Sequence, residues 1–135
     1  MTMDNFISRM QLSALWVFVL LNMLFRDVHE IGKPEFLEKA LVTHVSEYLF
    51  LAAGVILEIP LLMIVLCLFL ALPKLRWANI GAALLFGTLI IVNNLSPDLD
   101  DAFFAIVEVC ALLFIIWKSW YLQPADDGLA VIPQG

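Results

Sequence analysis

Basic residues and polar surface are scarce in this sequence. Only 15% of its 135 residues are charged, and seven Lys and Arg are outnumbered by thirteen Asp and Glu. The formal charge of −6 is the reverse of what a nucleic-acid-binding protein shows, so no nucleic-acid partner is expected. The chain also has no glycine-rich phosphate loop, zinc-ligand spacing or nucleophile elbow. The sequence therefore identifies no catalytic residue and no cofactor.

Cysteine is scarce as well. Cys67 and Cys110 lie in different apolar segments, at different expected depths in a membrane, so no disulfide is predicted between them. Quinone-linked thiol oxidoreductases also use four membrane helices, but they need a CxxC pair, which this chain lacks. Both cysteines are interpreted as small buried apolar residues.

Apolar residues, in contrast, are abundant. They make up 63% of the chain, the mean hydropathy is +0.97, and there is too little polar surface to coat a globule in water. A hydrocarbon core about 30 Å thick is crossed by roughly 20 helical residues, whereas a barrel strand alternates apolar and polar positions. We therefore expect an all-α integral membrane four-helix bundle, formed by one domain over residues 1–135 with a tail at 123–135. The predicted spans cover about 10–28, 46–72, 77–95 and 101–122.

A short amphipathic helix is predicted between the first and second spans. Pro34 suits the first turn of a helix, and Phe36, Leu37, Ala40 and Leu41 then fall on one face. We expect this helix to lie on the outer interface of the membrane or to cap the bundle.

Four spans place both termini on the same side of the membrane. That side holds four basic residues and the other side three, which favours cytoplasmic termini. Trp77, Trp117, Trp120 and Tyr121 gather on the terminal side, as an interfacial aromatic belt does. The expected location is the bacterial cytoplasmic membrane.

Polar residues within the spans are the candidates for function, because they are costly to place in lipid and usually face a bundle interior or a wet cavity. Glu58 lies in the second predicted span and Glu108 in the fourth. We expect a polar pocket between helices that opens on the outer side, with these two glutamates towards its floor. Helical spacing and position give seven candidate ligand-binding residues: Glu58, Glu108, Arg26, Asn22, His44, Glu47 and Asn93.

The same residues also have a purely structural interpretation. Arg26 would form a salt bridge with Glu108 or with Glu47, and Asn22 would make a hydrogen bond between helices. His44 and Glu47 have helical metal-ligand spacing, but di-iron bundles place the Glu before the His and repeat the motif. No metal site is therefore predicted.

Four segments resemble a bacterial family of small four-helix membrane proteins known only as a domain of unknown function. These segments are residues 12–28, 57–66 (LEIPLLMIVL), 76–80 (RWANI) and 103–120 (FFAIVEVCALLFIIWKSW). At Arg26 the chain departs from the family pattern, in which a small residue often precedes the aspartate. The resemblance implies the fold and no reaction; the outline is also DoxX-like, by analogy alone.

Several functions fit these features. The first is the binding of a lipid-like or amphiphilic small molecule in the pocket, or an accessory role, with the lipid bilayer as partner. The second is a small proton-coupled transporter of lipophilic compounds with an intramembrane Glu, although such exporters carry it in the first span, where this chain has Asn22. The third is an enzyme with two carboxylates as acid and base. The fourth is a structural subunit of a larger membrane complex, or a homo-oligomer.

Overall fold

The computed structural model describes residues 3–43, 46–95 and 97–122, and within these ranges every regular element is a helix. The all-α class is thus confirmed. The helices are α1 (Met3–Ile31), α2 (Pro34–Val42), α3 (Glu47–Phe69), α4 (Leu72–Asn93) and α5 (Leu99–Trp120). Four of them coincide with the predicted spans, although α1 begins earlier than expected, at Met3.

Three helices, α1, α3 and α4, are long and apolar enough to cross a membrane, counted over the described residues. Their most apolar windows have mean hydropathies of 1.5, 2.6 and 1.7. Large apolar side chains also cover the outside of the molecule; Phe18, Leu62 and Leu85, for example, are about half exposed. Extended apolar exteriors are unusual in water-soluble monomers and mark membrane contact. These properties are those of a membrane protein.

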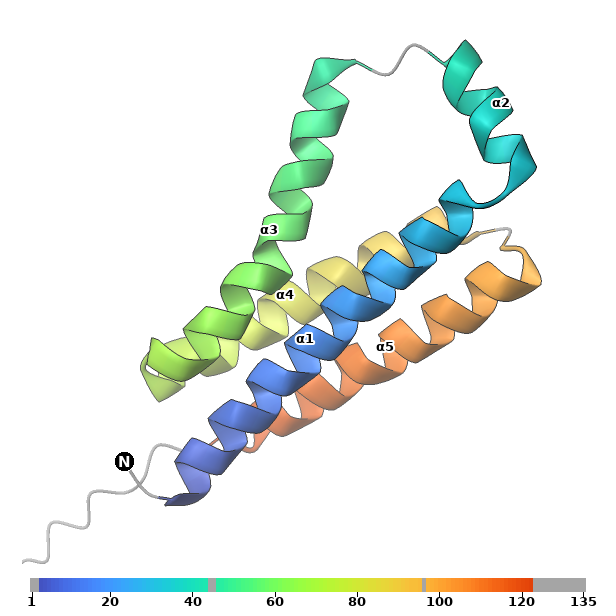
Figure 1. Cartoon of the computed structure of the whole chain (residues 1–135). Helices are drawn as coiled ribbons and strands as arrows, with labels where there is room; N and C mark the ends of the chain where they lie inside the picture. Colours follow the sequence, from blue (N-terminus) through green and yellow to red (C-terminus); the bar gives the residue numbers. More distant parts are fainter. Residues whose placement is uncertain (1–2, 44–45, 96, 123–135) are drawn as a thin grey trace, which may run out of the picture.

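The core lies between α1, α4 and α5, with the second half of α3 packed against α1 (Figure 1). Trp16 of α1 and Phe86 of α4 are its largest buried side chains, and their ring centroids lie 6.3 Å apart in an edge-to-face arrangement. Leu12 and Ile115 complete this layer from α1 and α5, with no exposed surface. An aromatic pair of this geometry contributes about 1 kcal/mol beyond the burial of its area.

Pro60 divides α3 into two halves with different surroundings. Proline lacks the N–H that would bond to the carbonyl four residues earlier, and its ring crowds that carbonyl, so a helix bends there. Figure 1 shows α3 changing direction near its middle, with its first half standing away from α1 and α4. Met63 and Cys67 of the second half are buried, whereas Tyr48 and Glu58 of the first half are exposed.

The predicted short helix between the first two spans is present as α2. It begins at Pro34, after an extended Lys33, which fits the preference of proline for a first helical turn. On the predicted apolar face, Phe36 is 37% and Leu41 86% exposed, so Leu41 in particular is left uncovered by the described chain.

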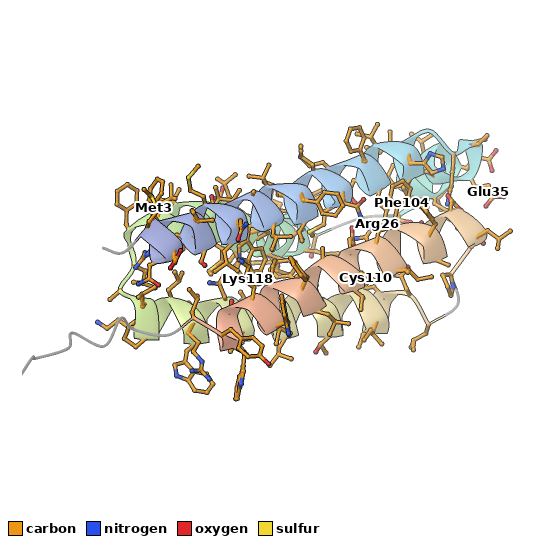
Figure 2. All side chains as sticks on the ribbon, turned by 90° about the horizontal axis from the view of Figure 1, so that it is seen from below. Met3, Arg26, Glu35, Phe104, Cys110 and Lys118 are labelled. Atoms are coloured by element: carbon orange, nitrogen blue, oxygen red, sulfur yellow. The ribbon has the colours of Figure 1, made fainter. Side chains whose placement is uncertain are left out.

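Charged side chains are distributed unevenly between the two ends of the molecule. The acidic end contains α2 and the adjoining helix ends, and the basic end contains the start of α1, the α3–α4 connection and the end of α5 (Figure 1). In Figure 2, Glu35 marks the acidic end and Met3 the basic end. The described acidic end has three basic and eight acidic residues: Arg26, Lys33, Lys39, Asp27, Glu30, Glu35, Glu38, Glu47, Asp98, Asp100 and Asp101. The described basic end has four basic residues and one acidic residue: Arg9, Lys74, Arg76, Lys118 and Asp4.

Candidate functional site

An ion pair between α1 and α5 forms the centre of the candidate site. Nη1 of Arg26 lies 2.9 Å from Oε2 of Glu108, and the Glu108 side chain has no exposed surface. Figure 2 shows Arg26 on the side of α1 that faces α5, near Phe104. Because a buried carboxylate without a partner is strongly destabilising, the guanidinium is what makes Glu108 tolerable in this position. Of the two partners considered for Arg26 in the sequence, the structure therefore selects Glu108.

Asn22 lies one helical turn before Arg26 and faces the same helix. Its Nδ2 donates a hydrogen bond to the carbonyl oxygen of Phe104, 3.3 Å away. Side chains four residues apart share one face of a helix, so Asn22 and Arg26 both connect α1 to α5. Three of the seven candidate residues are thus brought together at this contact: Asn22, Arg26 and Glu108.

Lys33, which follows α1, is surrounded by carboxylates from α1 and from the start of α5. Its Nζ lies 2.9 Å from Glu30, 3.0 Å from Asp100, 3.7 Å from Asp98 and 3.8 Å from Asp101. The close contact with the Glu30 carboxylate, and then that with Asp100, raises the pKa of Lys33 above its ordinary value. The same contact with Lys33 lowers the pKa of Asp100. One cation is therefore shared by four carboxylates.

A further contact joins the same two helices. Nε2 of His29, in the last turn of α1, lies 3.0 Å from Oδ2 of Asp100, the same oxygen that Lys33 contacts. The Lys33 cluster was not predicted, because Asp98, Asp100 and Asp101 lie more than about 60 positions away from Lys33 along the chain. Only the fold makes them neighbours.

A polar cavity of about 190 Å³ opens beside the Arg26–Glu108 pair. It lies between the acidic-end parts of α1, α4 and α5, and it contains three carboxylates and one guanidinium. Its lining residues are Arg26, Asp27, Glu30, Asn93, Asn94 and Asp101. Asn93 thus joins the candidate residues of α1 and α5 at this cavity.

An apolar groove of about 430 Å³ lies between α4 and α5. Ile90 of α4 and Ile106, Val109 and Cys110 of α5 contribute to its walls. Asn94, at the end of α4, lines both this groove and the polar cavity, and its Nδ2 donates to the carbonyl oxygen of Ile90 at 2.8 Å. The polar cavity and the apolar groove therefore share Asn94 as a lining residue.

The α3 candidates lie elsewhere. Glu58 and Glu47 are exposed and line neither the polar cavity nor the groove, and His44 lies outside the described residues. Helical spacing predicted which face of α3 carries Glu58, but it could not predict which helix, if any, packs against that face. Because the first half of α3 stands away from the other helices, Glu58 does not share a pocket floor with Glu108. A ligand-binding role for the full set of seven stays a prediction.

A buried polar cluster that was not predicted lies nearer the basic end. Nε1 of Trp16 donates to Oδ1 of Asn79 at 2.6 Å, and Sγ of Cys67 lies 3.6 Å from the same oxygen. Nδ2 of Asn79 donates to the carbonyl oxygen of Leu75 at 3.0 Å. All four residues have no exposed surface. The available signal was Asn79 itself, an amide within the third predicted span.

Arg9 is a second polar residue whose position was not predicted. It is only 8% exposed, and its Nη1 donates to the carbonyl oxygens of Cys67 at 3.1 Å and Leu68 at 3.3 Å. The last carbonyls of a helix lack intrahelical partners, and a cation suits the negative end of the helix dipole. Arg9 therefore caps the end of α3.

Among known proteins, similarity was found to one family model and to no curated protein or solved structure. The chain matches a family of unknown function (DUF6326) over residues 4–126, a range that includes nearly all of the five helices. No curated protein and no solved structure matches it. The long match over all the membrane-type helices shows that the chain belongs to this family of unknown function.

Proposed function

We propose that this protein binds a single-tailed amphiphile with a positively charged headgroup, with the headgroup in the polar cavity and the tail in the groove between α4 and α5. The observation that carries this proposal is the position of Asn94, which lines both spaces. An amphiphile needs a polar site that is continuous with an apolar one. Ligand sites typically measure roughly 300–1,000 Å³ and are mostly apolar with a few polar groups, a description that the two spaces together satisfy.

The charges around the cavity favour a cationic headgroup such as an amine. Asp27, Glu30 and Asp101 contribute carboxylates to its lining, while its guanidinium, that of Arg26, is already paired with Glu108. The nearby Lys33 is shared among four carboxylates. Negative charge is thus in excess here, and an ammonium group would reduce the repulsion between these carboxylates.

The proposal places the protein across a membrane with α5 as a fourth span. Both termini then lie on the basic side, and the excess of Lys and Arg there supports a cytoplasmic location for them, in a bacterial cytoplasmic membrane. The exposed apolar residues of α2, among them Leu41, would lie in the opposite interface. The cavity and the groove would open near that opposite interface, where a lipid-derived amine can enter from the bilayer.

Cys110 provides a direct test, because it is exposed and lines the groove, whereas Cys67 is buried. The full-length protein is placed in phosphatidylcholine nanodiscs, and the rate at which a membrane-permeant maleimide labels Cys110 is measured. Dodecylamine should slow the labelling, while dodecanol at the same membrane concentration should not. Charge-assisted hydrogen bonds are worth about 1.5–3 kcal/mol, so the amine should bind at least about tenfold more tightly than the alcohol.

Two aspartates of one turn supply the matched controls. Asp101 lines the cavity and Asp98 does not, although both lie at nearly the same distance from Lys33. Asp101→Asn should weaken the protection by dodecylamine, and Asp98→Asn should leave it unchanged. Equal protection by the amine and the alcohol, or equal loss in both variants, would show that the cavity does not select a cation. Labelling of Cys67 reports any unfolding.

A further inference from the structure

We propose a second binding site, at the basic end, for the phosphate of an anionic membrane lipid. It lies against the end of α5, at the side of α1, and is lined by Ser8, Trp117, Lys118, Tyr121 and Leu122. The site is separate from the cavity of the proposed function and does not depend on it. The lipid would be held by Lys118 and Ser8, with its chains along the aromatic side chains of α5.

The charge balance of the basic end is the first argument. Its four basic residues face a single described acidic residue, Asp4. Within residues 3–43, 46–95 and 97–122, none of the six ion pairs involves any of these four cations. The cations at the acidic end, in contrast, are mostly paired within the chain. Arg9 is buried and bonded to helix carbonyls, so the positive charge available for an external anion is that of Lys74, Arg76 and Lys118.

The shape and lining of the site are the second argument. The cavity measures about 180 Å³, and Lys118 is partly buried in it beside the hydroxyl-bearing Ser8. Trp117 and Tyr121 pack edge to face with centroids 5.6 Å apart, yet 56% and 67% of their surfaces are exposed. A lysine can lay its apolar stem along such rings and keep its ammonium at the polar boundary. A cation next to exposed aromatic rings suits a lipid headgroup with its glycerol and upper acyl chain.

Arg76 of α4 is another cation of the basic end. Its guanidinium carbon lies 4.4 Å from the ring centroid of Trp120 and 5.7 Å from that of Trp77. These cation–π contacts hold Arg76 among the aromatic residues of this end. They place a second cation beside the exposed rings of Trp77 and Trp120.

The location of the site favours a lipid phosphate over a free anion. Trp and Tyr concentrate where spanning helices leave the bilayer, at the depth of the headgroups. Basic pockets between spanning helices on the cytoplasmic side bind anionic headgroups, and each Lys or Arg near the surface contributes about 1 kcal/mol. The removal of one such charge should therefore weaken binding by about fivefold.

The test compares the binding of phosphatidylglycerol and phosphatidylcholine by native mass spectrometry of the full-length protein in detergent. The wild type should retain more phosphatidylglycerol, and Lys118→Gln should reduce that retention by about fivefold. Lys118→Arg should keep it. Lys39→Gln removes a positive charge from the acidic end and should have no effect, which makes it the matched control.

Three outcomes would overturn the proposal. Equal retention of the two lipids by the wild type would exclude headgroup selection. If Lys118→Gln and Lys39→Gln lost the same amount of bound phosphatidylglycerol, lipid retention would depend on the net charge of the protein and not on this site. Displacement of the lipid by millimolar inorganic phosphate would identify a site for free anions. Thermal unfolding of each variant, measured without added lipid, separates loss of the site from loss of the fold.

Discussion

The basic side chains at the two ends of this molecule have different kinds of partner. At the acidic end, Arg26 and Lys33 are both engaged in ion pairs with carboxylates of α1 or α5. At the basic end, Arg9 is bonded to helix carbonyls and Arg76 is stacked on tryptophan rings, with no ion pair to either in the described chain. The difference indicates where stability and where binding should be affected by substitution. Charges at the acidic end hold helices together through ion pairs, whereas Lys74, Arg76 and Lys118 at the basic end have no ion-pair partner among the described residues.

The largest effect is expected from Arg26→Ala, which leaves the Glu108 carboxylate buried without its partner. The removal of one member of a buried pair typically costs 3–5 kcal/mol, and the partial exposure of Arg26 favours the lower value. The free energy of unfolding, measured by denaturant titration in mixed micelles, tests this. Lys74→Ala, at the basic end, should change it by less than about 0.5 kcal/mol.

The double variant Arg26→Leu/Glu108→Leu sharpens this prediction. It removes both charges, so it should be more stable than Arg26→Ala even though more side-chain groups are changed. If the double variant were as unstable as Arg26→Ala, the two side chains would stabilise the fold through their packing and not through their charges.

A moderate effect is expected from Asn79→Leu, which tests whether the interior near the basic end depends on a neutral hydrogen bond. The substitution leaves Nε1 of Trp16 buried without an acceptor, which costs about 1–3 kcal/mol. Asn93→Leu on the same helix replaces an exposed amide and is the matched control. Equal unfolding free energies for the two variants would contradict a stabilising role for the bond between Trp16 and Asn79.

The smallest effect is a pH dependence at the acidic end. The contact with Lys33 lowers the pKa of Asp100 in the folded protein, so its contribution to stability is present above the ordinary aspartate pKa and is lost as the pH falls through the lowered value. The melting temperature of the wild type should therefore fall more between pH 6 and pH 3 than that of Asp100→Asn. Asp4→Asn, at the basic end, should follow the wild type. If the melting temperatures of the wild type and of Asp100→Asn fell equally with pH, the contact between Asp100 and Lys33 would not stabilise the fold.

The sequence-based predictions agree best with the structure for the long helices, whose positions follow from hydropathy alone. The long helices follow from continuous apolar runs, and α2 from Pro34 at its first turn. The pairing of Arg26 was narrowed in advance to two carboxylates, because the charges of neighbouring helices at similar depth are few. The sequence could not choose between them, since the choice depends on which helices are adjacent.

The contacts that the sequence did not predict all depend on tertiary geometry. The bend at Pro60 leaves Glu58 outside the polar cavity, and helical periodicity carries no information on bends between halves of a helix. Arg9 is one of the four basic residues expected on the side of the termini, yet it caps a helix nearly 60 residues away in the chain. Such contacts arise from the antiparallel return of the chain and have no local sequence pattern.

In the proposed orientation, the separation of charge between the two ends would also couple this molecule to the voltage of an energised membrane. With the basic end inside, as proposed, an interior-negative potential attracts that end and repels the acidic one. One elementary charge moved across the full potential corresponds to about 2.3 kcal/mol per 100 mV. Inversion of the molecule would carry the charges of both ends against the field, so the electrical gradient would keep the inserted orientation fixed long after synthesis is complete.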